Sequence, residues 1–355
     1  MSRRGSHNER RSTDPARNII VEQRIDPVAR AVVPPPRVVT RLTIIWQKVL
    51  ERPFVGPEQN FFELGGDPRT AIRMFDQIRR EFGRTIPPLA IYTAPTIHSL
   101  AHLIAGDRPA RFSNDLLLRS GSGRSPVFLL HGVGGNVMEF FEVLKSMDCP
   151  QAVYGLQARG SDGLEAPLDS IEAMAEYHMD AMRRVGSSGP YLVFGHSLGG
   201  LVALEIARRF KQSGQPVALL SMIDSYPHIS ALAARQKFQL YAQRARHRLG
   251  RMAQAAHADR SRLASEKICG PAVLEVTRSG LQALRTYRPR PFEEKVRFVR
   301  AQAVTVFPRD AAEIWKALLP QMEVETVAGD HHGILQANSR ELAVALSRYI
   351  RDALG

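Results

Sequence analysis

The run Phe194-Gly195-His196-Ser197-Leu198-Gly199-Gly200 places a serine between the apolar stretch 191–193 and the helix-like stretch 201–210. Gly195 and Gly199 stand two positions before and after Ser197, where a sharp strand-to-helix turn brings backbone segments close together. Such a turn, a nucleophile elbow, exposes the serine hydroxyl above a sheet. The free N–H groups at the start of the following helix also favour developing negative charge. Ser197 is therefore a candidate nucleophile.

A serine nucleophile needs a histidine to remove its proton and an acid to orient that histidine. On a fold with this elbow the chain order is serine, acid, histidine, and each residue lies just beyond a strand end. Asp224 ends the apolar run 219–223 and is the acid that we favour. The rival is Asp310, which follows the next strand region, although capping of its own helix also explains that residue.

The candidate base lies in Gly329-Asp330-His331-His332-Gly333, after the last predicted strand and before the last predicted helix. Position alone lets either histidine reach the serine. The tetrahedral intermediate also needs two backbone N–H donors. Leu198, directly after the serine, supplies one, and the loop His131-Gly132-Val133-Gly134-Gly135 after the first strand supplies the other. We predict Val133 as that second donor.

The elements that must position these residues alternate along residues 125–355. Six β-branched apolar runs predict buried strands at 127–130, 152–156, 191–194, 218–223, 296–299 and 324–327. Helical patterns between most of them fall at 136–147, 170–185, 198–212, 310–318 and 339–353. This alternation predicts an α/β fold with a doubly wound, mostly parallel sheet, in which ligands bind beyond the C-terminal strand ends.

One long segment, about 225–290, interrupts this alternation. Phe238, Tyr241, Ala245, Leu249 and Met252 form a narrow apolar stripe on an otherwise basic helix. We interpret the segment as an inserted helical lid. An amphipathic helix that merely packs on the domain fits the stripe equally well.

The N-terminal third has a different pattern. Residues 1–35 combine Arg, Ser, Asn and Pro with little apolar periodicity, which predicts a disordered Arg-rich tail. Residues 36–107 show helical spacing, with Leu42, Ile45 and Trp46 on one apolar face and Thr96 as a cap for a later helix. This indicates a small helical bundle whose modest core benefits from packing on its neighbour. A polar connection, 108–124, follows and is predicted to be a linker.

Composition sets limits on the function. The chain has 355 residues, 44% of them hydrophobic and 23% charged, which indicates a globular protein with room for two folded units. No apolar stretch reaches the roughly 20 residues of a membrane helix, and the start lacks the apolar centre of a secretory signal, so we expect a cytoplasmic protein without a membrane span. Cys149 and Cys269 show no metal-ligand spacing, and no metal site is expected.

The net charge of +13 is concentrated in two segments. Residues 1–45 hold nine Arg and four acidic residues, and residues 231–268 hold nine Arg or Lys and two acidic residues. A solvated tail and one basic helix explain this pattern, and no zinc-finger or RNA-binding signature accompanies it, so nucleic-acid binding is a minor hypothesis. The basic lid would attract an acidic carrier or the phosphate of a pantetheine arm, although a solvated helix face explains it more simply.

Residues 125–355 resemble the thioesterase domains that end nonribosomal peptide and polyketide synthases. The resemblance rests on VYGLQARG at 153–160, GPYLVFGHSLGG at 189–200, VALLSMIDSYP at 217–227 and GDHHGIL at 329–335. It implies an α/β-hydrolase fold, a helical lid over the site, and a triad of Ser197, Asp224 and His331. The base of the family directly follows the Gly-Asp pair, which leaves His332 as the weaker candidate.

Residues 38–105 resemble the peptidyl or acyl carrier domain that precedes such thioesterases, as in IWQKVL at 45–50 and NFFELGGD at 60–67. The family attaches a phosphopantetheine arm to a serine at the next position, where this chain has Pro68. Proline has no hydroxyl, so the arm cannot attach there, whereas Pro suits the first turn of a helix after an Asp cap. Thr70 lies within the helix and is an improbable substitute.

Together these features predict a serine thioesterase that receives its acyl or peptidyl chain in trans, from a separate carrier protein, a synthase module or coenzyme A. No covalently bound cofactor is expected, and the phosphopantetheine arm would belong to the substrate. Hydrolysis, cyclisation and transfer to another acceptor stay open. The alternatives are an oxoester hydrolase with the same triad and a non-catalytic docking or scaffold protein left from a synthase.

Overall fold

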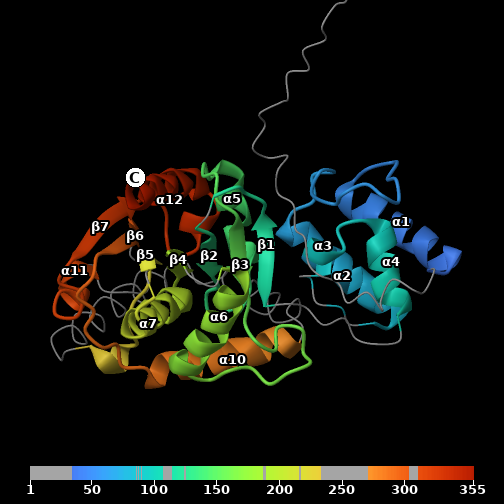
Figure 1. Ribbon diagram of the computed structural model, residues 1–355. Helices are drawn as coiled ribbons and strands as arrows, with labels where there is room; N and C mark the ends of the chain where they lie inside the picture. The colour runs from blue at the N-terminus through green and yellow to red at the C-terminus, as the bar shows by residue number, and fades with distance from the viewer. Residues whose placement is uncertain are drawn as a thin grey trace, which may run out of the picture.

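The computed structural model describes residues 34–355 apart from 85, 87, 89, 107–113, 124, 187–188, 216, 233–270 and 304–310. Within these residues, seven strands form one sheet in the order β1-β3-β2-β4-β5-β6-β7 (Figure 1). They are β1 Asp115–Arg119, β2 Val127–Leu130, β3 Val153–Leu156, β4 Tyr191–His196, β5 Val217–Ile223, β6 Val296–Ala301 and β7 Met322–Val327. β1 pairs antiparallel with β3, and every other neighbouring pair is parallel.

Helices cover both faces of the sheet, as the doubly wound prediction requires (Figure 1). One face carries α6 Ile171–Val185, α7 Leu198–Gln212 and α10 Pro271–Thr286, and the other carries α5 Phe141–Ser146 and α12 Ser339–Leu354. Residues along β2 alternate between the two cores. Phe128 and Leu130 belong to the core under α6 and α7, while Val127 and Leu129 belong to the core under α5 and α12.

All six predicted strands are present, and the α/β-hydrolase architecture is confirmed. The central strands β2 and β4 are buried along their whole length, which explains their continuous apolar runs. Short elements complete the domain: the 3₁₀ turns η3 Val137–Phe140, η4 Ile229–Ala231 and η5 Gly333–Leu335, and the helix α11 Ala311–Trp315.

The predicted linker 108–124 is wrong in part, because it contains β1. Leu116 and Leu118 alternate into the sheet core, and Arg119 is buried, where its guanidinium donates to the carbonyl oxygens of Met147 and Cys149 at 2.6 and 3.2 Å. Polar and glycine-rich neighbours hide this short edge strand in the sequence. The predicted tail, the basic helix at 238–252 and the rival acid Asp310 lie outside the described residues.

The N-terminal bundle consists of α1 Pro36–Leu50, α2 Pro68–Phe82, α3 Ala90–Thr93 and α4 Ile97–Ala105, of which the short α3 was not predicted. Its core includes Trp46 and Phe61 and extends to Met138 and Phe141 of η3 and α5. The rings of Phe62 and Phe141 lie 5.2 Å apart between centroids. The bundle therefore packs on the element that directly follows the loop after β2.

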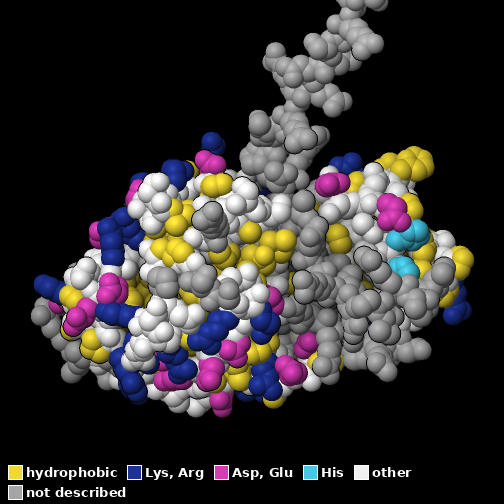
Figure 2. Space-filling view, in the orientation of Figure 1, with side chains coloured by type: hydrophobic (Ala, Val, Ile, Leu, Met, Phe, Trp, Pro, Cys, Tyr) yellow, Lys and Arg dark blue, Asp and Glu magenta, His cyan; other side chains and the backbone are white. Residues whose placement is uncertain are grey.

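Figure 2 shows charged side chains of both signs and hydrophobic side chains interspersed over the visible face of the α/β domain, and further hydrophobic side chains at the outer end of the bundle. Among the exposed residues of the bundle are Phe54, 85% exposed, and Ile44, 57% exposed. None of the helices in the described part of the chain is long and apolar enough to cross a membrane.

Candidate active site

Ser197 lies between β4 and α7 in a backbone conformation that few residues other than glycine adopt, with φ 54° and ψ −116°. Close packing around the turn explains the glycines at either side. A Cβ on Gly195 would collide with the backbone of Gly199, and a Cβ on Gly199 would lie 2.5 Å from the carbonyl oxygens of Leu130 and His131. These contacts make the turn a nucleophile elbow.

Asp224 directly follows β5 and is 4% exposed. Its carboxylate is fixed from two sides, because Oδ1 accepts hydrogen bonds from Ala301 N at 3.1 Å and from the Tyr226 hydroxyl at 3.3 Å. Its backbone N–H donates to Val299 O at 2.7 Å. The ends of β5 and β6 therefore hold this acid in one orientation.

His331, on the loop after β7, connects the acid to the serine. Its Nδ1 lies 2.7 Å from Asp224 Oδ2, and its Nε2 lies 3.1 Å from Ser197 Oγ. A carboxylate at this distance accepts, so Nδ1 carries the proton and Nε2 faces the hydroxyl as an acceptor. The structure thus brings the three predicted residues from three separate loops into one hydrogen-bonded chain.

His332 does not join this chain. Its backbone N–H binds Asp330 Oδ1 at 3.2 Å, and its ring lies 5.2 Å from the His331 ring between centroids. Burial and the neighbouring histidine rings lower the pKa of His332. Among the described residues its ring makes no hydrogen bond to Ser197 or Asp224.

The two predicted oxyanion donors are Leu198, directly after Ser197, and Val133, in the loop after β2. Leu198 is the first residue of α7, so its N–H lacks a partner within the helix. The loop after β2 turns tightly, with Gly135 N donating to Gly132 O at 3.1 Å, and the intervening Val133 N–H has no partner among the described residues. α10 covers this loop, because a Cβ on Gly280 would lie 3.2 Å from the side chains of both Val133 and Leu198.

Glu139 and His196 form a second polar network that connects the loops of the site. Glu139 accepts from Gly132 N at 2.5 Å and lies 3.3 Å from Nδ1 of the buried His196. Nε2 of His196 donates to the carbonyl oxygen of His331 at 3.0 Å. Burial alone lowers the pKa of His196, but Glu139 and the His331 carbonyl outweigh it and raise that pKa. This network was not predicted, since nothing in the spacing of these residues along the sequence indicates that they meet.

α2 begins at Pro68, the position where the resemblance to carrier domains predicts a serine. Asp67 caps the helix by accepting from Thr70 N at 2.7 Å, and Thr70 Oγ1 accepts in return from Asp67 N at 2.8 Å. The Thr70 hydroxyl is thus engaged in a capping box.

Among the described residues, no group of three or more His, Cys, Asp and Glu side chains is arranged to hold a metal ion.

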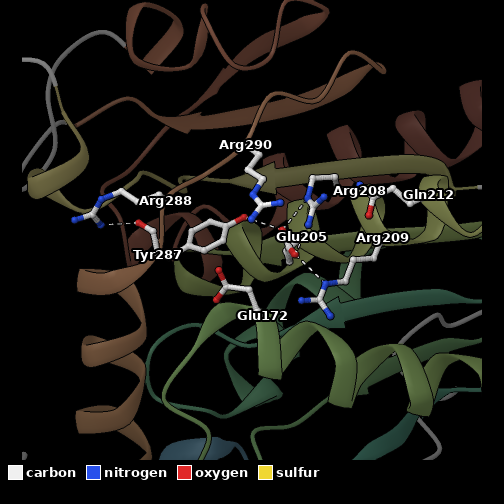
Figure 3. A pocket seen from close by; sticks show the side chains of 8 residues that line it. All are labelled: Glu172, Glu205, Arg208, Arg209, Gln212, Tyr287, Arg288 and Arg290. Carbon is white, nitrogen blue, oxygen red and sulfur yellow. Dashed lines mark hydrogen bonds and ion pairs between the residues drawn. The ribbon is translucent and has the colours of Figure 1, made fainter.

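A polar cavity of about 380 Å³ lies between α6, α7 and the chain after α10 (Figure 3). At its floor the buried Glu205 accepts from Arg208 Nη2 at 2.7 Å and Arg209 Nε at 2.8 Å, and the Tyr287 hydroxyl donates to it at 3.3 Å. Burial by itself raises the pKa of Glu205, but these arginines lower it overall. The carboxylate of Glu205 is therefore paired within the protein and joins α7 to the chain after α10. Glu205 also lies roughly 12 Å along α7 from Ser197, so this cavity is separate from the serine site.

The sheet order, the elbow and the serine–histidine–acid arrangement are those of an α/β hydrolase. The family model described as "Thioesterase domain" matches residues 125–350, and the one described as "Phosphopantetheine attachment site" matches residues 40–104. The chain belongs to the thioesterase domain family, and a carrier-type domain precedes the thioesterase domain.

Its curated relatives include much longer synthetases. The chain is 34% identical to malpibaldin synthetase of Mortierella alpina over 195 residues, which is 54% of this chain and 4% of the relative. It is 32% identical to a dimodular nonribosomal peptide synthase of Bacillus subtilis (strain 168) over 185 residues, which is 52% of this chain and 8% of the relative. The chain therefore spans less than a tenth of the length of either relative.

Two solved structures share the fold. A four-domain nonribosomal peptide synthetase, holo-AB3403, matches 91% of this chain and 26% of its own, with a TM-score of 0.57 and 22% identity. YbtT, described as a type II thioesterase from the yersiniabactin pathway, matches 68% of this chain and 100% of its own, with a TM-score of 0.53 and 18% identity.

Proposed function

We propose that the protein is a serine thioesterase that removes an acyl or peptidyl chain from a carrier-protein or coenzyme A thioester. The observation that carries this proposal is the hydrogen-bonded chain from Ser197 Oγ through His331 to Asp224, with distances of 3.1 and 2.7 Å. Membership of the thioesterase family supports the choice of a thioester as substrate.

In the first half of the reaction, His331 Nε2 takes the proton of Ser197 as Oγ attacks the thioester carbonyl carbon. The N–H groups of Val133 and Leu198 hold the oxyanion, and Asp224 stabilises the imidazolium that forms. The tetrahedral intermediate then collapses, the carbon–sulfur bond breaks, and His331 returns the proton to the leaving thiolate. The products are a free thiol and an acyl chain esterified to Ser197.

In the second half, His331 removes a proton from water or from a hydroxyl or amine of the substrate, and that group attacks the carbonyl carbon of the acyl ester. The bond from this carbon to Ser197 Oγ then breaks, and His331 returns the proton to Oγ, which restores the free serine. Water gives hydrolysis, and an internal nucleophile gives a cyclic product. The polar chemistry at Ser197 is the same for both, so the shape of the acyl site determines the outcome.

The acyl chain is delivered in trans in this proposal. Proline at position 68 offers no hydroxyl for a phosphopantetheine arm, and the Thr70 hydroxyl is engaged in the capping box of α2. A separate acyl or peptidyl carrier, a synthase module or coenzyme A must therefore present the thioester.

The test uses the full chain and a Ser197→Ala variant. We expect a fluorophosphonate probe to label the wild-type protein, detected by intact mass, and wild type to turn over acyl-carrier or acyl-coenzyme A thioesters. Both activities should be lost in Ser197→Ala. Labelling that persists in the variant would exclude Ser197 as the nucleophile, and matched oxoesters turned over faster than thioesters would favour the oxoester hydrolase instead.

A further inference from the structure

Two buried histidines lie beside the oxyanion loop and take no part in the proposed triad. His131 directly precedes Gly132, and His178 lies on α6; they are 2% and 1% exposed. Their rings meet edge to face, with centroids 5.5 Å apart. This pair brings two polar rings next to Val133, into a cavity that Tyr177 and Arg159 also line; Arg159 forms an ion pair with Glu165 at 3.4 Å.

The ring of His131 presents an unpaired acceptor. Its Nδ1 lies 2.7 Å from Gly132 O, and because a carbonyl oxygen only accepts, Nδ1 carries the proton. Burial lowers the pKa of His131, so the ring is neutral and Nε2 has a free lone pair. Within the described residues, neither His131 Nε2 nor His178 Nδ1 has a hydrogen-bond partner.

Burial, together with the neighbouring His131, lowers the pKa of His178 well below its ordinary value. Both rings are therefore neutral at neutral pH, and the pair does not attract an anion. Buried polar atoms are nearly always paired in folded proteins, since an unmatched acceptor loses the hydrogen bond that water would supply. We therefore expect His131 Nε2 and His178 Nδ1 to bind a neutral polar group.

Both histidines line a small cavity together with Val133 and Leu198, and α10 closes it with Val276 and Gly280. Its free volume is about 10 Å³, which is room for one group of the size of a hydroxyl. Val133 and Leu198 are also the residues whose N–H groups would hold the oxyanion. The cavity is therefore adjacent to the position of the thioester carbonyl.

We propose that this cavity binds a hydroxyl group of the acyl chain close to the thioester carbonyl, and that hydroxyacyl thioesters are the preferred substrates. This inference rests on the proposed thioesterase function. The hydroxyl donates its one hydrogen to His131 Nε2 and accepts from His178 Nδ1, which carries the proton in this arrangement. A hydroxyl fits where a planar amide is too large, and a chain without it leaves both nitrogens unpaired.

A site built to hydrogen-bond a hydroxyl discriminates strongly against the analogue that lacks it. For a small neutral group in a buried site we expect a preference of about tenfold to a hundredfold in kcat/KM. The test compares N-acetylcysteamine thioesters of hexanoic, 2-hydroxyhexanoic and 3-hydroxyhexanoic acid with the full chain. A ratio near one for both hydroxyacyl substrates would overturn the inference.

Variants assign the preference to the histidines. His178→Leu should reduce the hydroxyacyl-to-acyl ratio several-fold, and His131→Leu should bring it close to one. Damage to the oxyanion loop by His131→Leu affects both members of a substrate pair and cancels in their ratio. Met182→Leu, a similar replacement at a buried position on α6, is the matched control and should keep the wild-type ratio. A preference unchanged in both histidine variants would place the recognition elsewhere.

A binding measurement separates this inference from the proposed function. In the Ser197→Ala protein, which cannot form the acyl-enzyme, the hydroxyacyl thioester should bind at least tenfold more tightly than the unsubstituted one by titration calorimetry. Turnover without a hydroxyl preference contradicts the inference alone. Absence of all thioester turnover contradicts the proposed function, and the binding ratio still decides whether the cavity recognises a hydroxyl.

Discussion

Helices α2 and α7 begin in opposite ways, although the family resemblance predicts a reactive serine at the start of each: at position 68, the first residue of α2, and at Ser197, directly before α7. At α2 the cap Asp67 has an ordinary extended backbone, Thr70 completes the capping box, and Pro68 occupies the first turn. At α7 the residue in the cap position is Ser197, with φ 54° and no side-chain cap. The first start has hydrogen bonds from its own side chains, whereas the second has no side-chain cap.

This difference shows how a helix N-terminus is divided between stability and chemistry. The α2 start uses its side chains to pair its own N–H groups, and proline removes one N–H altogether. The α7 start has a strained backbone, which costs on the order of 1–3 kcal/mol, and the Leu198 N–H has no partner among the described residues, as the proposed oxyanion role requires. The Ser197 hydroxyl instead forms a hydrogen bond with His331, which lies 134 residues away along the chain.

The largest effect is expected from removing the carboxylate of Asp224, which orients His331 next to Ser197. Asp224→Asn should lower kcat by about 10⁴-fold, because an amide donates toward His331 and favours the wrong tautomer of its ring. Steady-state kinetics on an acyl thioester measure the effect, and circular dichroism checks that the fold persists. Turnover close to wild type would exclude Asp224 as the acid and favour Asp310 again.

Glu139 tests whether the site also depends on the network around His196. Glu139→Ala removes the acceptor of Gly132 N–H and the partner of His196, so the oxyanion loop and the His331 loop both lose a fixed contact. We expect kcat to fall about 10- to 100-fold with a smaller change in KM, since small misplacements of reacting groups are this costly.

Glu139→Gln is the matched control for this positioning role. Its amide keeps an oxygen for Gly132 N–H and a donor for a neutral His196, whose Nε2 still donates to the His331 carbonyl. Most of the wild-type kcat should therefore return. Equal losses in the Ala and Gln variants would show that the charge of Glu139, rather than its hydrogen bonds, is what the site needs.

Removing the cap of α2, Asp67, should affect the stability of the bundle and not the activity of the α/β domain. Asp67→Ala should lower the free energy of unfolding of the bundle by about 1 kcal/mol, the usual effect of losing a helix N-cap. Urea unfolding followed through Trp46, the single tryptophan of the bundle, measures this loss. Thioester turnover should stay within twofold of wild type, and a large fall in kcat would show that the bundle contributes directly to the active site.

Ser197 and Asp224 are predicted because each directly follows a strand whose apolar run is easily recognised. Position after the last strand leaves both His331 and His332 possible, and only the family resemblance selects His331. β1 was missed because its apolar run, 116–118, is only three residues long and polar residues flank it on both sides. Glu139 and His196 lie 57 residues apart, and His131 and His178 come from a loop and a helix. Only the packing of the sheet against its helices brings these side chains together, so no local pattern reveals the contacts.

The smallest change restores the missing hydroxyl to α2. Pro68→Ser should lower the stability of the bundle by no more than about 1 kcal/mol, since a proline at the first helical turn mainly restricts the unfolded chain. Incubated with coenzyme A and a broad-specificity phosphopantetheinyl transferase, the variant should gain the mass of one phosphopantetheine group, and wild type should gain none because Thr70 stays in its capping box. If the variant also stays unmodified, the bundle has lost more of the carrier function than one hydroxyl, and the contrast between the two helix starts extends to the surface around α2.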